Sequence, residues 1–345
     1  MMSLKMVSKA AKAVLLGGLT ATVLLPSITI ADDVIHWRLQ SHLPSGGSDW
    51  EKSVVAVRDK LYERTGGRLD IELHSAGSLF GGTEVFPAAS RGVIQIGHTS
   101  PAYVMNEVST AALAWGPTSF RTVSEAAYFW KHLGFEELIR EEVLEDHNLH
   151  YFTDTLYFTA LLLNKPVDSV EDFEGLRIRG AGSLAQFISD AGAATTFISG
   201  PEIYQALSTG AVDGAHWGAA QNKDALSLYE PAKYHVSTPI GIANEIFVIN
   251  KDAMAALPED IQATVRSTLE EHFWARSNQF EIEEREMLDQ LIADKGVNII
   301  DLPEEIQQRM FESAHEFRQE QADRSEYTAE AVERLEAYLE MLGYL

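Results

Sequence analysis

The chain has 345 residues, a net charge of −24 and no cysteine. The acidic balance argues against nucleic acid and anionic membrane surfaces as partners, and the lack of cysteine excludes disulfides, thiol catalysis and thiolate metal ligands. A chain of this length exceeds what one hydrophobic core usually holds, so we expect two domains.

The first 31 residues have the pattern of an export signal. Three lysines precede a mostly apolar run over 13–25, and the small residues at 29–31 suit a signal peptidase. The apolar run is shorter than the roughly 20 residues that span a bilayer. We predict cleavage near Ala31–Asp32, which removes three positive charges and leaves a chain of net charge −27 in the periplasm. An uncleaved membrane anchor is the alternative.

The first half of the chain alternates strand and helix patterns. Apolar periodicity predicts a strand over 34–41, a helix over 49–64, a strand over 66–73, a turn over 75–82 with a helix to about 91, a strand over 93–97 and a helix over 125–145. Asp49 is the predicted N-cap of the first helix. Such alternation is typical of α/β layers with largely parallel sheets.

The second half begins with strands and ends almost wholly helical. The patterns predict strands within 150–164 and over 241–250, and helices after Pro258 with a break near 296–303. No segment rich in proline, glycine and serine separates two halves. The two domains should therefore be joined by several crossings of the chain rather than by one flexible tether.

The stretch 175–214 is the most informative part of the sequence. A short strand over 176–179 delivers Arg179 to a glycine-containing turn, and a helix over 201–209 begins at a proline. A strand that ends in arginine and opens onto a helix N-terminus suits a carboxylate, because the guanidinium offers a bidentate fork and the helix offers free N–H groups. Arg177, two residues earlier, should point to the opposite face and meet solvent.

Motifs spread along the chain together resemble one protein family. They are Gly67-Arg68 with Ile71, Gly77-Ser-Leu79 with Gly81, Gly92–Gly97, Asp172–Arg179, Glu202–Leu207 with Gly210, Asp213 and Gly214, and Asn250-Lys251 with Leu257-Pro258. Each motif alone is weak, but in this order behind an export signal they are specific. The sequence resembles the substrate-binding proteins of TRAP (tripartite ATP-independent periplasmic) transporters, the DctP family.

The resemblance implies an α/β fold of two domains that close on a solute, each a sheet flanked by helices, with long helices that span both. It places one domain at 33–155 plus 245–284 and the other at 156–244 plus 285–345. It also implies that the closed form docks on a permease of one small and one large membrane subunit, driven by an ion gradient. No chemistry is done on the solute, so the protein is not expected to be an enzyme.

The resemblance also assigns roles in the solute site. Arg179 would hold a carboxylate of the solute, and Trp217 would close over it, as in the branch that binds 2-oxo acids or lactate. That branch often has an acid before the tryptophan, associated with a bound cation, whereas this chain has His216. We therefore expect no cofactor or metal, and a Na⁺ or Ca²⁺ ion in the site is doubtful. His216 would either donate to the solute or pair with an acid.

Further candidates lie at strand ends. Tyr157 and Phe158 would form an aromatic wall, or simply pack in the core. Loop residues after strand ends, where open α/β sheets present ligand contacts, complete the set. These residues are Gln40, Asp49, Trp50, Thr99, Ser100, Tyr103 and Asn244.

Other functions stay open on the sequence alone. The solute could be a zwitterion, a sugar acid, an aromatic acid or a small amine, and a different class of protein would be an exported α/β enzyme or a sensor-only receptor. Gly180-Ala-Gly182-Ser-Leu-Ala185 has the form of a dinucleotide-binding turn, but an exported chain rarely meets such cofactors. His147 and His150 have loose metal-ligand spacing, and a solvated turn explains them better.

Overall fold

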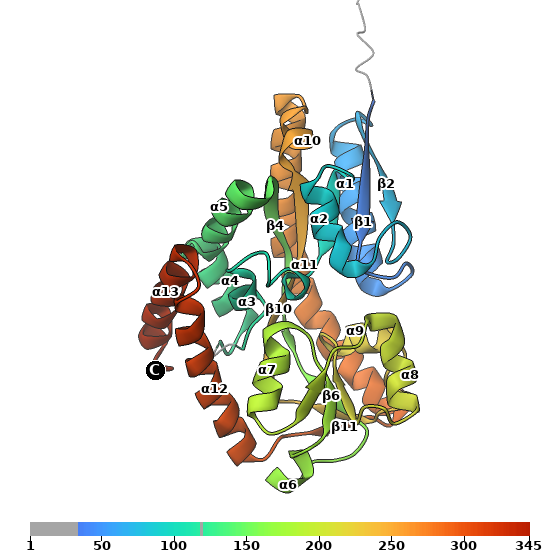
Figure 1. Cartoon of the computed structure of the whole chain (residues 1–345). Helices are drawn as coiled ribbons and strands as arrows, with labels where there is room; N and C mark the ends of the chain where they lie inside the picture. Colours follow the sequence, from blue (N-terminus) through green and yellow to red (C-terminus); the bar gives the residue numbers. More distant parts are fainter. Residues whose placement is uncertain (1–33, 118–119) are drawn as a thin grey trace, which may run out of the picture. The chain divides into compact units, whose positions relative to one another are not determined.

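The computed structural model describes residues 34–117 and 120–345 (Figure 1). The predicted export signal lies outside the described residues. Two sheets flanked by helices organise the described part, which confirms the α/β class. The first sheet has the order β2-β1-β3-β10-β4, and the second has the order β11-β9-β5-β8-β6-β7.

The strands match most of the predicted segments. The first sheet contains β1 (Ile35–Ser41), β2 (Leu69–His74), β3 (Ile96–Thr99), β4 (Leu149–Thr159) and β10 (Gly241–Asn250). The second contains β5 (Leu161–Leu163), β6 (Arg177–Arg179), β7 (Ala194–Thr196), β8 (Gly214–His216), β9 (Tyr234–Val236) and β11 (Asn298–Ile300). The strand predicted over 93–97 begins three residues later than expected.

Both sheets are mixed rather than largely parallel. In the first sheet β1 pairs in parallel with β2 and β3, but β10 runs antiparallel to β3 and β4. In the second sheet β5 runs antiparallel to β8 and β9, while the pairs β6–β7, β6–β8 and β9–β11 are parallel. The antiparallel strands arise where the chain passes from one sheet directly into the other, so no helical crossover restores the parallel direction.

Helices cover the two sheets. The α-helices are α1 (Ala56–Arg64), α2 (Val85–Ser90), α3 (Ala111–Ala114), α4 (Val123–His132), α5 (Phe135–His147), α6 (Val170–Phe173), α7 (Gly182–Asp190), α8 (Ile203–Ser208), α9 (Ala220–Ala225), α10 (Lys251–Ala255), α11 (Glu259–Lys295), α12 (Glu304–Ala322) and α13 (Glu326–Leu342). Short turns of other helix types are η1 (Trp50–Val55), η2 (Gly82–Glu84), η3 (Pro101–Tyr103) and η4 (Gly200–Glu202).

One local prediction is wrong, and a second, the N-cap role of Asp49, holds in position only. The single helix expected over 125–145 is two helices, because Gly134 adopts a left-handed backbone (φ 80°) that ends α4 and starts α5. Asp49 makes no capping bond to the first helix. Its carboxylate instead pairs with Arg276 of α11, and this tertiary contact replaces the capping bond to the helix backbone.

The chain crosses between the sheets more than once. Residue 160 is the only one between β4 and β5, and the segment 237–240 leads back from β9 to β10. The helix α11, which has 37 residues, then packs against α1 and β4 and also against α9 before the chain reaches β11. These crossings agree with the expectation of several connections and with the predicted long spanning helix (Figure 1).

The two C-terminal helices pack on each other and on different neighbours. The helix α12 contacts α7 beside the second sheet, whereas α13 contacts α5 (Figure 1). Ala331, Leu335, Tyr338 and Leu339 of α13 are buried in the same hydrophobic core as the aromatic residues of α4. The domain boundaries drawn from the sequence stay a prediction. Among the described residues, no helix combines the length and apolarity needed to cross a bilayer.

Candidate functional site

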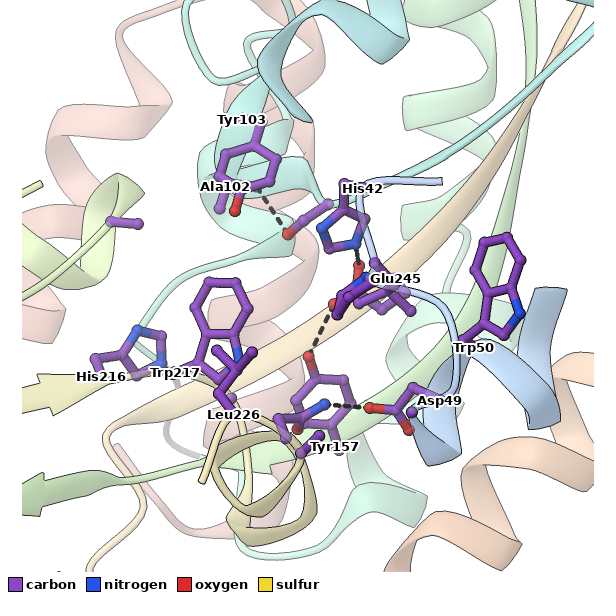
Figure 2. Close-up of a pocket in the computed structure, with 18 of the residues that line it drawn as sticks. His42, Asp49, Trp50, Ala102, Tyr103, Tyr157, His216, Trp217, Leu226 and Glu245 are labelled. Carbon is purple, nitrogen blue, oxygen red and sulfur yellow. Dashed lines mark hydrogen bonds and ion pairs between the residues drawn. The ribbon is translucent and has the colours of Figure 1, made fainter. Parts of the chain in front are cut away.

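A cavity lies where strands and loops of both sheets meet. Its lining includes His42 after β1, Tyr157 of β4 and Glu245 of β10 from the first sheet, and Arg179 of β6 and His216 of β8 from the second. Figure 2 shows Tyr103, His42, Tyr157 and Trp217 grouped around this space. Five strands of two sheets thus deliver side chains to one place, as open α/β sheets commonly do at their strand ends.

The cavity is small. It offers about 60 Å³ to the centres of water-sized molecules. Since one water needs roughly 10–15 Å³ on this measure, the space holds about four to six water positions. A solute of a few heavy atoms fits this volume.

Arg179 is the buried cation of the cavity. It ends β6, is 2% exposed, and donates from Nε to the carbonyl of Ile198 (2.9 Å) and from Nη1 to the carbonyl of His216 (2.7 Å). These bonds fix the plane of the guanidinium and leave Nη2 buried with no hydrogen-bond partner among the described residues. Burial lowers the pKa of Arg179, and the neighbouring Tyr103 hydroxyl opposes part of the shift.

No carboxylate among the described residues forms an ion pair with Arg179. Arginine keeps its charge even when buried, so the folded protein holds an uncompensated cation at the cavity wall. The transfer of an unpaired charge from water into the protein interior costs on the order of several kcal/mol. An anion that entered the cavity would relieve this cost.

Arg177, on the same strand, meets solvent as predicted, but the expectation that it faces away from Arg179 is wrong, because residues two apart on a strand share a face. Its side chain is about half exposed and makes a two-point pair with Asp213, in which Nε and Nη2 each reach a carboxylate oxygen at 3.0 Å. It also donates to the carbonyl of Gly210. The two arginines of the strand therefore differ in burial and partners: Arg177 holds a surface loop, and Arg179, at the end of the strand, lines the cavity.

Trp217 lies over Arg179. The guanidinium carbon of Arg179 is 5.0 Å from the indole centroid, and 5.6 Å from the ring of Phe197. The indole packs on the backbone of Gly200 so closely that a Cβ there would come within 2.5 Å of it. Glycine at 200 therefore gives the indole its place, and the aromatic faces stabilise the buried cation.

His216, the residue before Trp217, is buried and neutral. Burial, with Arg179 and Lys223 nearby, puts the pKa of His216 well below its ordinary value. Its Nε2 contacts the Thr159 hydroxyl, and that hydroxyl donates to the carbonyl of Gly218 (3.0 Å). Its Nδ1 is buried with no partner in the described part of the chain. The prediction that His216 pairs with an acid has no counterpart in these contacts.

A carboxylate sits on the first-sheet side of the cavity. Glu245 accepts from the Tyr157 hydroxyl at Oε1 (3.0 Å), and its Oε2 lies 2.8 Å from Nε2 of His42. Burial and the charge of Glu245 raise the pKa of Tyr157, so the phenol stays protonated and donates. The His42 ring also packs edge-on against Tyr103.

Asp49 links the two sides of the cavity. One oxygen of its carboxylate accepts from Arg276 (2.7 Å), and the other contacts the amide of Asn222, which follows the second sheet's β8. Burial raises the pKa of Asp49, and the charge of Arg276 opposes this rise. Its carboxylate is thus already compensated, unlike the guanidinium of Arg179.

The structure brings most predicted site residues together. Eight of them line the cavity: Arg179, Trp217, His216, Tyr157, Asp49, Trp50, Ser100 and Tyr103. Four others do not line it: Phe158, Gln40, Thr99 and Asn244.

The four residues outside the lining have other surroundings. Gln40 bonds both backbone groups of Phe80 and so fixes the loop after β2. Phe158 packs against the core that contains α4 and α5. Thr99 and Asn244 are fully buried beside the lining residues Ser100 and Glu245. Adjacent strand residues face opposite sides of a sheet, which explains why one of two neighbours lines the cavity and the other does not.

Sequence reasoning missed several residues that line the cavity. Among them are His42, Trp115, Asn222 and Glu245. A signal existed for Glu245, because it is the one charged residue in an otherwise uncharged predicted strand over 241–250. A charge in such a strand needs a partner or a ligand. No local pattern singles out Trp115 or Asn222.

The acidic side chains of the cavity lining have protein partners. Within 34–117 and 120–345 no group of three or more histidine or acidic side chains is placed to hold a metal ion. The two acids of the lining, Asp49 and Glu245, are each engaged by protein donors. His147 and His150 do not cluster either, and nearby cations together with burial lower the pKa of His150 to about 4.

The family follows from comparison with known sequences. The profile of the family described as bacterial extracellular solute-binding protein, family 7 (DctP), matches residues 40–325. The chain belongs to this family. A monocarboxylate 2-oxoacid-binding periplasmic protein of Nostoc sp. is 26% identical over 310 residues, which cover 88% of this chain and 84% of that protein.

Solved structures share the fold. A TRAP periplasmic solute-binding protein of Colwellia psychrerythraea, with bound calcium and pyruvate, superposes with a TM-score of 0.83 at 20% identity, covering 90% of this chain and 96% of that one. One of Pseudoalteromonas atlantica, with bound sodium and pyruvate, gives 0.81 at 20% identity, covering 90% and 95%.

The family fixes the general role. DctP-family proteins are the solute receptors of TRAP transporters and work with membrane permease subunits, so this protein is a receptor and not an enzyme. Relatives bear periplasmic names. The recognition made from the motifs is confirmed.

Proposed function

We propose that this DctP-family protein captures a small carboxylate, which Arg179 binds in the cavity, and delivers it to the permease. The observation that carries the proposal is the buried Nη2 of Arg179, which has no partner among the described residues although its two sister nitrogens are fixed. A carboxylate oxygen is the partner that a guanidinium fork suits best. The 2-oxo acid and pyruvate named for relatives agree in charge and size.

Domain closure would complete the site. The contact between Asp49 and Asn222 joins the two sides of the cavity, and Tyr103 faces Arg179 across it. A solute bound to both sides would favour the closed form over the open one, which is the state a permease can read. The predicted domains, 33–155 plus 245–284 and 156–244 plus 285–345, are the bodies proposed to move.

Solute binding in this chain is proposed to need no cation. Relatives hold calcium or sodium beside their solute. Here the residue before Trp217 is a neutral, buried histidine, and the lining acids are already paired. Affinity measured by calorimetry should be unchanged in EDTA and in sodium-free buffer. A loss of affinity restored by Ca²⁺ or Na⁺ would contradict this.

The periplasm is the proposed location, with the export signal removed near Ala31–Asp32. The signal pattern of the sequence and the periplasmic names of relatives support it. The N-terminal sequence of the protein recovered from the periplasm tests the cleavage position.

Substitution of the buried arginine tests the carboxylate role. Arg179→Ala should weaken binding of the carboxylate solute by about 2–4 kcal/mol, because the solute's charge loses its charge-assisted bonds. Arg177→Ala is the matched control, since it removes an exposed arginine of the same strand that does not line the cavity. Calorimetry on both variants gives the difference. Equal affinities for wild type and Arg179→Ala would sink the proposal.

The solute class is found by a thermal-shift screen of small carboxylates, zwitterions, sugars and amines. A ligand at 100 times its Kd should stabilise the protein by about 2.7 kcal/mol. A hit confined to amines would favour the alternative of a small amine, which the acids Asp49 and Glu245 in the lining make the next candidate.

A further inference from the structure

Four residues of the cavity lining each carry one buried polar atom without a partner in the described residues. They are Nη2 of Arg179, Nε1 of Trp115, Nδ1 of His42 and Nδ1 of His216. Buried polar atoms are nearly always satisfied, and leaving one unpaired is costly. Four in one small cavity indicate the pattern of donors and acceptors that its ligand must present.

Two of the four atoms can only donate. The guanidinium of arginine and the indole N–H of tryptophan have no acceptor capacity. Nη2 of Arg179 and Nε1 of Trp115 therefore require acceptor atoms on the ligand. A carboxylate, with two oxygens and about four lone-pair directions, supplies both.

His42 presents an acceptor. Its Nε2 lies 2.8 Å from Oε2 of Glu245, and an ionised carboxylate only accepts. Nε2 must therefore carry the proton. In the neutral imidazole the other nitrogen, Nδ1, is then a bare acceptor, and Nδ1 is the atom left without a partner.

His216 presents a second acceptor by the same logic. The single hydroxyl proton of Thr159 goes to the carbonyl of Gly218, which can only accept. The Thr159 oxygen must then accept from Nε2–H of His216. The lowered pKa of His216 excludes a second ring proton, so its unpartnered Nδ1 carries a lone pair.

Glu245 adds to the acceptor side. Tyr157 and His42 take one lone pair from each of its oxygens, and the carboxylate lines the cavity. The lining thus combines a donor set, Arg179 with Trp115, and an acceptor set, His42, His216 and Glu245. A plain 2-oxo acid has acceptors only and would leave the acceptor set unpaired.

We infer that the solute carries a hydrogen-bond donor, a hydroxyl or an amine, next to the carboxylate, as a 2-hydroxy acid or a 2-amino acid does. This inference rests on the proposed function and sharpens it. The carboxylate meets Arg179 and Trp115, and the donor meets the acceptor set. The cavity volume suits a compact member of either class.

A matched ligand series tests the inference. Propionate, pyruvate, lactate and alanine share a three-carbon frame and differ only in the group beside the carboxylate, and the four- and five-carbon analogues extend the series. Kd values are measured by calorimetry in EDTA and sodium-free buffer. We expect lactate, alanine or their longer analogues to bind about tenfold or more tightly than the 2-oxo and unsubstituted acids of the same length.

The outcomes separate the two proposals. A 2-oxo acid that binds as tightly as its hydroxy and amino analogues overturns the inference but leaves the carboxylate role intact. Binding of neutral or cationic ligands with no carboxylate bound at all overturns the proposed function. The relative strength of lactate and alanine identifies the donor as hydroxyl or ammonium.

A conservative variant adds an independent test. Glu245→Gln replaces one acceptor oxygen with an NH₂ group, so His42 or Tyr157 must accept from it, and the negative charge disappears. The preference for the hydroxy or amino acid over the 2-oxo acid should fall at least severalfold. An unchanged ratio in a folded variant would count against the acceptor set, and the wild-type series stands even if this variant does not fold.

Discussion

Two buried arginines near the cavity have opposite surroundings. Arg276 of α11 is 1% exposed, and Arg179 of β6 is 2% exposed. Both lie over aromatic rings, Arg276 at 4.8 Å from Phe280 and Arg179 at 5.0 Å from Trp217. Arg276 pairs with Asp49 (2.7 Å) and Glu283 (3.0 Å), whereas Arg179 donates to the carbonyls of Ile198 and His216, lies near the Tyr103 hydroxyl, and meets no carboxylate among the described residues.

The difference teaches that burial does not mark a ligand-binding arginine. The informative feature is a missing anion, because a buried charge must be compensated from somewhere. Arg276 is compensated within the fold and acts as a structural link. Under the proposed function, a carboxylate that enters the cavity compensates Arg179. Three predictions test this contrast, in addition to the binding assay of Arg179→Ala.

The largest expected effect is on stability. Arg276→Ala should lower the free energy of unfolding by about 3–5 kcal/mol, because the largely buried carboxylate of Asp49 loses its cation, while Glu283 keeps its ion pair with Lys52. Arg179→Ala, the matched variant, should cost clearly less, since no carboxylate loses a partner. Urea denaturation of the ligand-free proteins measures both. Similar losses of unfolding free energy in the two variants would contradict the view that Arg276 is structural and Arg179 is not.

A third buried cation sharpens the comparison through pH. Lys223 is fully buried and donates to the carbonyl of Gly218 (2.7 Å); burial lowers its pKa from 10.5 to about 7, and nearby Glu284 opposes the shift. Because the unfolded state binds the proton up to about pH 10.4, stability should rise between pH 7 and 10. Lysine can release its proton, but arginine cannot.

Replacement of Lys223 should remove this pH dependence. In Lys223→Met the rise in unfolding free energy between pH 7 and 10 should be smaller than in wild type by about 3 kcal/mol. Thr159 still donates to the carbonyl of Gly218, so the loop keeps a hydrogen bond. Lys295→Met, at a partly exposed lysine paired with Asp224, is the control and should leave the profile unchanged. Parallel profiles for wild type and Lys223→Met would refute the assignment.

The smallest expected effect concerns the ring over Arg179. Trp217→Leu should weaken carboxylate binding by about 1–2 kcal/mol, because the indole stabilises the desolvated guanidinium and closes the cavity. Trp217→Phe, which keeps an aromatic face, should lose less. Calorimetry with the best ligand of the screen ranks the three proteins. An order in which phenylalanine is worse than leucine would assign Trp217 to packing alone.

The sequence by itself determined the α/β class, the family and the arginine of the cavity. Strand and helix periodicity is a local property, and the motif around Arg179 and Trp217 is contiguous enough to read. The split of 125–145 at Gly134 shows the limit of such reading, since one backbone angle outweighed a continuous helical pattern.

Only the tertiary structure decided which charges meet. Asp49 and Arg276 are 227 positions apart, and His42 and Glu245 are 203 apart, so no local pattern links them. The same packing left Arg179 without a carboxylate among the described residues and brought His42 to Glu245 and His216 to Thr159. The donor and acceptor pattern of the cavity exists only when distant strands converge, because hydrogen bonds and ion pairs depend on distance in space and not on separation along the chain.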